Sequence, residues 1–463
     1  MQPANKTIKA VDLVRSALEK AQKHEEFHCF ISMNTENALQ RAARIDQKIE
    51  KGEPVGKLAG IPYALKDNFS SPDGNTTAAS HMLENFQAPI TATAVAKLEA
   101  EGAIMIGRTN LDSFAHGSST ENSYFGPTLN SHDKTRVAGG SSGGSAVAVA
   151  LGIVPFALGS DTGGSIRQPA SYNGVIGVKP TYGTVSRYGV VSMASSTDTI
   201  GCFTNTATDA NTIMSIIAGK DEKDSTTLDD FWDKPSKTVE SLRIGIISDF
   251  LGEGVDPEII DHINNCAKTC QKFGAKVDQI ELPILKHALA IYYIVQTAEV
   301  ASNLSRYDGI RYGHRAKNTK DLSDLYGQSR DQGFMPENIR RIMIGNFVLS
   351  SGFFDAYYQK AQKARTLLIN AYNKAFEKFD VLLCPVTPSP AFKLGEKTSD
   401  PLAMYLEDAM SVPPSVAGLP AISVPTGLTS AGLPVSAQLI GAPQSDRTLL
   451  DLAGKLEEVI CPA

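Results

Sequence analysis

Residues 139–165 read GGSSGGSAVAVALGIVPFALGSDTGGS, which is two loops of small residues separated by an apolar run. A single Gly/Ser cluster is most often a turn or a flexible linker. Here the apolar run at 146–158 has to be buried in a core, so the loops at its two ends are held inside a packed layer. In such a layer glycine lets backbone N–H groups converge on a small space. The stretch therefore indicates two fixed loops, one containing Ser141 and the other Ser165.

The sequence on both sides of these loops has the segment pattern of an α/β protein. Short apolar runs alternate with Gly/Ser-rich turns and with helix-like stretches such as 93–101, which favours buried strands in a layered architecture. Strand-like runs return near the C-terminus, and we expect them to complete the sheet begun near Leu58. The strand-like runs are 61–65, 103–107, 152–158, 174–178, 242–250, 275–282, 379–388, 420–428 and 434–443.

Helical periodicity dominates the remaining sequence. Apolar residues three and four apart predict amphipathic helices at 9–22 and 37–50 and over most of 284–375, and an Asp/Pro pair starts another helix at 256. A polar segment in the middle of the chain could mark a domain boundary, but the returning strands favour one large domain. The predicted organisation is a single domain over 1–463, with an N-terminal helical region at about 1–57, a catalytic core at about 58–218, a polar linker at about 219–240, and the rest of the sheet and helical cover at about 241–463.

Composition excludes several classes of protein. The chain has 44 basic and 50 acidic residues, a net charge of −6, which is the wrong sign for binding nucleic acid without a partner. The six cysteines are scattered and form no C-x-x-C pair, so they indicate reduced, mostly buried thiols of a cytosolic enzyme. The start lacks a signal or transit peptide, and no stretch approaches the ~18 apolar residues of a membrane span. We expect a cytoplasmic location.

The first loop also fits the pattern G-x-S-x-G around Ser141, as in the nucleophile elbow of α/β-hydrolases. A triad of that kind needs a histidine downstream, and only His262, His287 and His314 follow the loop. Each of them lies in polar or helical sequence without the loop context of such a base. For each, a surface or structural role is the favoured interpretation.

A neutral lysine can activate a serine in place of histidine, and Lys66 ends the apolar run 61–65. Shifting a lysine pKa from ~10.4 to near 7 corresponds to about 4 to 5 kcal/mol, which requires burial without a neighbouring carboxylate. Asp67 follows directly, but successive side chains of an extended segment face opposite sides. On these residues alone, a strand-end lysine that reaches solvent stays the alternative.

Five segments of the chain resemble the amidase signature family. They are LKDNF with Lys66, GGSSGGS with Ser141, GSDTGGSIRQPA with Ser165, and the following GVKPTYG and VSRYGVVSMASSTDTIG. The intervals between the three residues match the Ser-cisSer-Lys triad of that family, and the similarity extends over nearly the whole chain. More narrowly, the segments 108–130, 302–313, 340–365 and 417–427 resemble the A subunits of amidotransferases acting on glutamyl-tRNA(Gln) and aspartyl-tRNA(Asn).

The resemblance implies a large mixed β-sheet covered by helices and a reaction without a metal. Ser165 attacks the side-chain amide of glutamine and forms an acyl-enzyme, while Ser141, after a cis peptide bond, relays the proton between Ser165 and Lys66. The oxyanion hole is expected from the backbone N–H groups of Thr162, Gly163, Gly164 and Ser165. Ser142, Asp161 and Arg167 are expected to support the loops by hydrogen bonds.

For the substrate, the resemblance implies Asp408 for the α-amino group and Arg341 for the α-carboxylate of glutamine. Arg340 is the alternative cation, and Tyr292 is expected to line the pocket. The implied partners are B and C subunits. ATP, magnesium and misacylated tRNA are expected mainly on the B subunit, with none of these cofactors held by this chain. The rival interpretations are a stand-alone amidase that acts on another small amide and an inactive assembly scaffold.

The chain departs from the family pattern at several places, and its C-terminus is also expected to be short. The stretch HGSS at 116–119 replaces a more hydrophobic and glycine-rich sequence, and Thr184 stands where a basic residue is usual. The chain also begins close to VDLVRSALEK, so part of the usual N-terminal helical region is expected to be missing. We expect these departures to affect partner contacts and details of the pocket more than the reaction.

Overall fold

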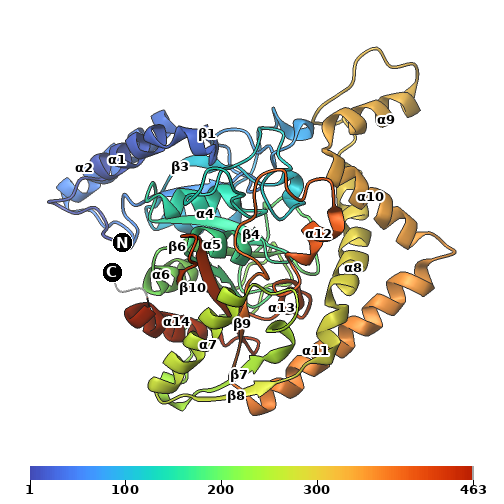
Figure 1. Ribbon diagram of the computed structural model, residues 1–463. Coiled ribbons are helices and arrows are strands. Elements are labelled where there is room, and N and C mark those ends of the chain that lie inside the picture. The colour runs from blue at the N-terminus through green and yellow to red at the C-terminus, as the bar shows by residue number, and fades with distance from the viewer. Residues whose placement is uncertain (461–463) are drawn as a thin grey trace.

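Eleven strands form one mixed sheet through the middle of the molecule (Figure 1), in the order β1-β3-β2-β4-β6-β5-β10-β11-β9-β7-β8. The structure is a computed structural model, and it describes residues 1–460. The strands are β1 (Phe30–Met33), β2 (Pro62–Lys66), β3 (Ile104–Thr109), β4 (Phe156–Asp161), β5 (Ile176–Lys179), β6 (Thr199–Thr204), β7 (Arg243–Ile247), β8 (Lys276–Ile280), β9 (Val381–Pro385), β10 (Ala421–Leu428) and β11 (Pro434–Gly441).

Strands from the two halves of the chain join in the middle of this sheet. β5 pairs antiparallel with β10, with Val178 opposite Ile422. β2 lies between the parallel strands β3 and β4, so the lysine at its end is surrounded by other strands. The expectation that the late strands complete the early sheet is therefore confirmed.

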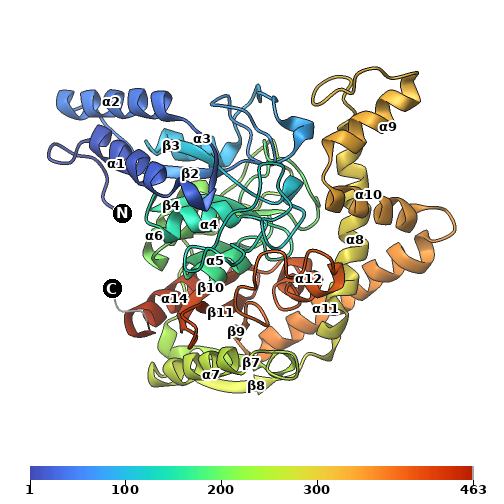
Figure 2. The same cartoon turned by 45° about the horizontal axis from the view of Figure 1, so that its top comes forward.

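Helices cover both faces of the sheet, as Figures 1 and 2 show. Neighbouring strand residues face opposite layers: Leu65 belongs to the core cluster that includes residues of α3, α6 and α14, whereas Ala64 belongs to the cluster that includes residues of α1, α2 and α4. This alternation is the period of two expected of a strand buried on both faces. The helices are α1 (Ala10–Lys23), α2 (Thr35–Lys51), α3 (Thr93–Ala100), α4 (Gly143–Ala150), α5 (Arg167–Asn173), α6 (Ala207–Ile217), α7 (Pro257–Lys272), α8 (Ala288–Asn303), α9 (Leu322–Gly333), α10 (Pro336–Leu349), α11 (Lys360–Lys378), α12 (Pro401–Leu406), α13 (Val412–Val416) and α14 (Asp446–Ile460).

Most predicted elements are present with small shifts at their ends. The helix predicted from 256 is α7, where the Asp256 side chain accepts a hydrogen bond from the Glu258 N–H at 2.9 Å and Pro257 opens the first turn. Three strands differ from expectation. β6 corresponds to none of the predicted strand-like runs. β1 lies within the segment predicted to be helical, and β4 begins only at Phe156, because the residues just before it form a turn.

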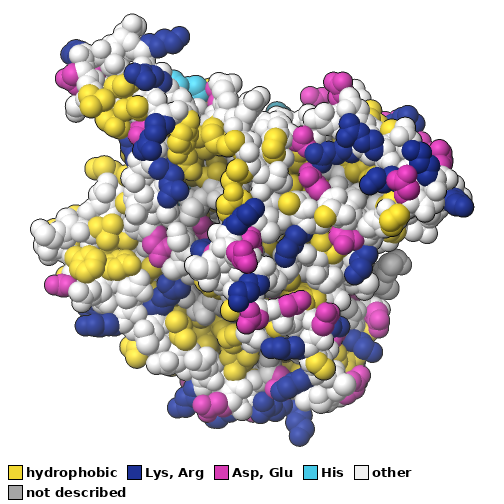
Figure 3. All heavy atoms as spheres, turned by 180° about the vertical axis from the view of Figure 1, so that it is seen from behind, with side chains coloured by type: hydrophobic (Ala, Val, Ile, Leu, Met, Phe, Trp, Pro, Cys, Tyr) yellow, Lys and Arg dark blue, Asp and Glu magenta, His cyan; other side chains and the backbone are white. Residues whose placement is uncertain are grey.

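Helices α8 to α11 stand together at one side of the sheet, and α9 projects from the body of the molecule (Figures 1 and 2). Seen from behind, this side carries hydrophobic side chains at the surface, while basic and acidic side chains are interspersed over the rest of the visible face (Figure 3). The exposed apolar residues of α10, α11 and their connection are Met343, Ile344, Phe347, Leu349, Phe353, Tyr357 and Leu367.

Among residues 1–460, no helix is both long and apolar enough to cross a membrane. The same part of the chain contains no group of three or more His, Cys, Asp or Glu side chains arranged to hold a metal ion. Five of the predicted buried thiols are indeed buried and unpaired, namely Cys29, Cys202, Cys266, Cys270 and Cys384. The sixth, Cys461, lies outside the described residues.

Candidate active site

The two Gly/Ser loops meet at the carboxyl ends of β2 and β4. The first loop leads into α4 and the second runs from β4 into α5, and the Ser142 N–H donates to the Ser165 carbonyl at 3.2 Å. The peptide bond between Gly140 and Ser141 is cis, as the family resemblance implied. A Cβ on Gly140 would lie 2.6 Å from the backbone nitrogen of Ser119, so only glycine fits there.

Lys66 is fully buried at the end of β2, and its Nζ lies 2.9 Å from Ser141 Oγ. Burial lowers the pKa of Lys66 from 10.5 to about 7, an effect that the nearby carboxylates of Asp112, Asp161 and Asp198 oppose. None of these carboxylates is hydrogen-bonded to Nζ. The predicted geometry of a buried lysine that contacts Ser141 and no carboxylate is therefore present.

Asp67 faces away from this site, as strand alternation predicts. Its carboxylate forms a buried ion pair with Arg108 at 3.1 Å and accepts a hydrogen bond from the Thr77 N–H at 2.9 Å. Because Asp67 is paired on the opposite side of β2, it does not restore the charge of the neighbouring Lys66.

Ser160 is a contact of Lys66 that the sequence reasoning missed. Its Oγ lies 2.9 Å from Lys66 Nζ and accepts a hydrogen bond from Asn68 Nδ2 at 3.0 Å, and its carbonyl oxygen lies 3.4 Å from the same Nζ. Ser160 thus offers acceptors for the two N–H bonds of a neutral amine. The lone pair of the amine can then point toward Ser141, from which it has to accept a proton. The only available signal was a hydroxyl near the end of β4.

Ser165 is buried in the loop after β4, and its Oγ forms no hydrogen bond with any of residues 1–460. Catalytic hydrogen bonds are often long in unliganded enzymes and shorten when the substrate binds. The backbone N–H groups of Thr162, Gly163 and Ser165 have no partner in the described chain. The Gly164 N–H differs from expectation, because it donates to Asp161 Oδ1 at 2.9 Å and is not free for an oxyanion.

Asp161 and Arg167 support the loop from inside, as predicted. The Arg167 guanidinium pairs with Asp161 at 2.9 Å and donates to the Ser411 carbonyl at 2.7 Å, and both side chains are fully buried. Asp161 also accepts from the Ile166 N–H at 3.1 Å. The loop is therefore tied at both ends to one buried ion pair, which limits its freedom to move.

A second buried lysine shows why burial alone does not define the base. Burial also lowers the pKa of Lys179 to about 7. Its Nζ donates to the carbonyls of Leu419 at 2.6 Å and Pro180 at 3.1 Å. Among residues 1–460 it has no serine hydroxyl within hydrogen-bond distance, so of these two lysines only Lys66 can exchange a proton with a serine.

Arg341 and Asp408 are both buried on the helical side of the site. Arg341 Nε donates to Glu337 at 2.8 Å, and its guanidinium lies 5.3 Å from the ring centre of Tyr293. Asp408 accepts from Ser118 Oγ at 2.6 Å and lies 3.5 Å from the Tyr293 hydroxyl. Tyr293 therefore links the two predicted substrate residues.

Arg340 and Tyr292 are the other two residues predicted for the substrate pocket. Arg340 is exposed and pairs with Glu337, so Arg341 is the better-placed cation. The Tyr292 ring packs directly against the loop of Ser165, because a Cβ on Gly163 would lie 2.7 Å from the Tyr292 hydroxyl oxygen. Tyr292 thus contacts the catalytic loop.

A hollow of about 250 Å³ opens beside Arg341, and Ser118, Glu337 and Tyr405 share its wall. Burial raises the pKa of Asp408 to about 7, while the Ser118 hydroxyl and Arg341 oppose this rise. A cationic group brought next to Asp408 would stabilise its charged form. Arg341 lines the hollow directly, whereas Asp408 is not part of its wall and is joined to it through the Ser118 hydroxyl.

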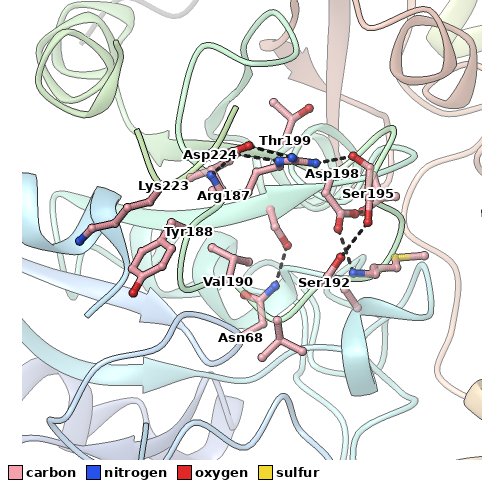
Figure 4. A pocket seen from close by; sticks show the side chains of 16 residues that line it. Asn68, Arg187, Tyr188, Val190, Ser192, Ser195, Asp198, Thr199, Lys223 and Asp224 are labelled. Atoms are coloured by element: carbon pink, nitrogen blue, oxygen red, sulfur yellow. Dashed lines mark hydrogen bonds and ion pairs between the residues drawn. The ribbon is translucent and has the colours of Figure 1, made fainter. Parts of the chain in front are cut away.

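A second hollow, of about 210 Å³, adjoins Ser160 and Thr162 (Figure 4). In Figure 4 the Asn68 side chain reaches from this hollow to the Ser160 hydroxyl. Thr162 Oγ1 donates to Asp198 at 2.7 Å at the same place. The loop of Ser165 is thus bordered by polar side chains on this side.

Two of the three histidines weighed as bases for a hydrolase triad, His262 and His314, have other partners. The ring nitrogens of His262 lie 3.0 Å from the Thr426 carbonyl and 3.3 Å from the Leu428 carbonyl, and His314 Nε2 lies 2.9 Å from Gln332. Neither contacts a serine of the two loops. The lysine arrangement is the one that the geometry supports.

A profile of the amidase family matches residues 12–450, which is most of the chain. The chain belongs to the amidase family. This amidase is 49% identical over 458 residues to a protein of Thermoanaerobacter pseudethanolicus that is named as the A subunit of glutamyl-tRNA(Gln) amidotransferase. The match covers 97% of this chain and 93% of the relative.

Solved structures agree with the family assignment. A crystal structure of the glutamyl-tRNA(Gln) amidotransferase A subunit from Thermotoga maritima has 38% identity and a TM-score of 0.81, covering 98% of the amidase and 92% of that chain. A bacterial aryl acylamidase of the amidase signature family has 27% identity and a TM-score of 0.83, covering 99% and 94%. The large mixed sheet covered by helices is thus the amidase signature fold, as predicted.

Proposed function

We propose that this amidase is the glutamine-hydrolysing A subunit of a tRNA-dependent amidotransferase. The observation that carries the proposal is the 2.9 Å contact between Ser141 and a buried lysine, Lys66, whose pKa is lowered by burial to about 7. Half of such a lysine is neutral at about pH 7, which is what a general base needs. Ser165 is the nucleophile in this proposal.

The proton moves along the three residues in both directions. Ser165 Oγ attacks the side-chain carbonyl carbon of glutamine while its proton passes to Ser141, and the Ser141 proton passes to Lys66. When the tetrahedral intermediate collapses, the proton returns by the same route to the leaving nitrogen, which departs as ammonia. Water then hydrolyses the acyl-enzyme to glutamate. The oxyanion is stabilised by the free N–H groups next to Ser165, and this step uses no metal or cofactor.

Asp408 and Arg341 select glutamine among small amides. Asp408 binds the α-amino group and Arg341 the α-carboxylate, and both side chains are buried where solvent does not screen them. Burial strengthens each of these charge pairs. It also raises the free-energy cost of leaving either charge without a partner. Tyr292 keeps the loop of Ser165 in place beside this pocket.

The released ammonia passes to a B subunit that holds ATP, magnesium and the misacylated tRNA, and a C subunit completes the complex. Two observations support this division: the relatives that are named as A subunits and the net charge of −6, which disfavours direct tRNA binding. The product is Gln-tRNA(Gln), Asn-tRNA(Asn) or both, because the partners select the tRNA. We place the complex in the cytoplasm.

The proposal is tested by purifying the chain with its B and C partners. Glutamine should then support ATP-dependent amidation of Glu-tRNA(Gln) or Asp-tRNA(Asn), measured separately with each misacylated tRNA. A complex that amidates neither tRNA and releases no ammonia from glutamine would refute the proposal.

The second candidate function is a stand-alone amidase, which the similarity to an aryl acylamidase favours. It predicts that the isolated chain hydrolyses a small amide as fast as the complex does. Ammonia release that requires the partners would exclude it. Acylation of Ser165 by an amidase-directed probe would exclude an inactive scaffold.

A further inference from the structure

His116 has two ring nitrogens in different environments. The side chain is fully buried just after the turn η3 (Ser113–Ala115). Nδ1 lies 2.6 Å from Asn338 Nδ2, whereas Nε2 is buried and has no hydrogen-bond partner among residues 1–460. A buried polar atom without a partner is uncommon and requires an explanation.

Asn338 determines which ring nitrogen of His116 carries the proton. Asn338 Oδ1 accepts from the Met335 N–H at 3.0 Å, and because a backbone N–H can only donate, this atom must be the oxygen. Asn338 Nδ2 therefore donates, to the Ser113 carbonyl at 2.8 Å and to His116 Nδ1. Burial and the nearby Arg341 lower the pKa of His116 well below 6.5, so the ring is neutral. Its single proton is on Nε2.

His116 lines the same hollow as Arg341. Arg341 Nε is bound to Glu337, and its two terminal amino groups form no hydrogen bond within the described chain. Arg341 and His116 thus both line the hollow, and each carries an N–H group without a hydrogen-bond partner among residues 1–460. Two such donors match the two oxygens of a carboxylate. His116 is also the first residue of HGSS, where this sequence departs from the more hydrophobic family pattern.

We propose that His116 Nε2–H is a second donor, beside Arg341, to the α-carboxylate of the amide substrate. This inference rests on the proposed function, because it assumes that the substrate is glutamine. His116 is then a specificity-determining residue. Its hydrogen bond orients the carboxylate that Arg341 attracts by charge. Because Asn338 of α10 sets the His116 tautomer, this recognition depends on the same helix that carries Arg341.

The decisive experiment compares His116→Met with the wild type as complexes with the partner subunits. Ammonia release is measured from L-glutamine and from L-glutamine methyl ester, which lacks the anionic carboxylate. We expect the KM for glutamine to rise roughly tenfold, with kcat changed less than about twofold and the kinetics of the ester unchanged. The matched control is His287→Met, which removes an exposed histidine and should leave the kinetics with both substrates unchanged.

Two results of this comparison would overturn the proposal. Equal losses for both substrates would assign His116 a purely structural role, and unchanged kinetics for both would mean that it does not touch the carboxylate. If the wild-type complex releases no ammonia from glutamine, the proposed function itself fails. If the wild-type complex hydrolyses glutamine normally and the variant has an unaltered KM for glutamine, only the proposed role of His116 is refuted.

A second measurement is independent of whether the variant folds. In wild-type complex labelled with ¹⁵N-histidine, the His116 signals should show an unprotonated Nδ1 and a protonated Nε2. Addition of L-glutamate, which carries the same α-carboxylate, should move the Nε2–H resonance. A protonated Nδ1, or an Nε2 resonance that does not respond to saturating L-glutamate, would contradict the proposal.

Discussion

Lys66 can accept a proton only while its amino group is neutral. Because burial lowers its pKa to about 7, the charged form predominates below that pH and has no lone pair for Ser141. We therefore expect kcat/KM for glutamine hydrolysis to fall about tenfold per pH unit below ~7 and to level off above it. A pH profile of initial rates between about pH 5.5 and 8.5 checks this, and a flat profile would contradict the role of Lys66.

Ser160 offers a way to assign that pH dependence to Lys66. Replacing Ser160 with alanine removes an oxygen 2.9 Å from Lys66 Nζ, which stabilises the ammonium and orients the amine. We expect kcat to fall roughly ten- to a hundredfold at unchanged KM, and the rising limb of the profile to move to lower pH.

Ser436→Ala is the matched control for this variant, because the Ser436 hydroxyl is buried and has no partner in the described chain. It should leave both kcat and the pH profile unchanged. A lower kcat in Ser160→Ala without any movement of the limb would mean that Ser160 acts on the fold rather than on Lys66.

At the scale of elements, the loop between β4 and α5 is held by helices that come much later in the chain. Tyr292 of α8 packs on Gly163, and Ser411 Oγ donates to the Gly163 carbonyl at 2.8 Å. The position of the nucleophile is therefore set by packing of α8 and of the segment before α13 against a loop that they do not adjoin in sequence.

Gly163→Ala should displace this loop, because the new Cβ would lie 2.7 Å from the Tyr292 ring. A shift of about 1 Å at a catalytic group can lower the rate about a hundredfold, so we expect kcat/KM to fall by this order. Gly327→Ala in α9 is the control, because its Cβ meets no atom within 4 Å. Equal activity of the two variants would show that Tyr292 does not constrain the loop.

At the scale of the whole molecule, the site combines residues from both halves of the chain. Lys66, Ser141 and Ser165 come from the early strands and the loops beside them, whereas Arg341 and Asp408 come from the late helical segments. Hydrolysis of glutamine and use of ammonia are separate tasks in the proposed complex, so a variant can lose one and keep the other.

Ser165→Ala should abolish glutamine-dependent amidation in the complex and leave ammonia-dependent amidation intact. The nucleophile is lost, while the partner that activates the tRNA is untouched. The measurement is tRNA amidation with glutamine and with ammonium chloride as alternative nitrogen donors. Loss of activity with both donors would contradict the division of labour in the complex.

Much of the fold could be predicted from local patterns. Period-two and period-3.6 spacing identified most strands and helices, and the burial of 146–158 required that its flanking loops be fixed in the core. β1 was missed because its four residues form a largely apolar run between two amphipathic helices that is too short for periodicity to distinguish a strand from a helix end. β6 was also missed. The site was predictable where a side chain sits in a specific motif, as for Lys66, Ser141 and Ser165.

The chemistry available to this protein follows from its sequence alone: two serines in glycine-rich loops, a lysine at a strand end, and the order of strands and helices. How that chemistry is tuned depends on the tertiary structure. Burial without a bonded carboxylate makes Lys66 a base, Asp161 withdraws the Gly164 N–H from the oxyanion site, and Asn338 sets the tautomer of His116. These effects arise from desolvation and from contacts between side chains that the fold brings together, which local sequence does not encode.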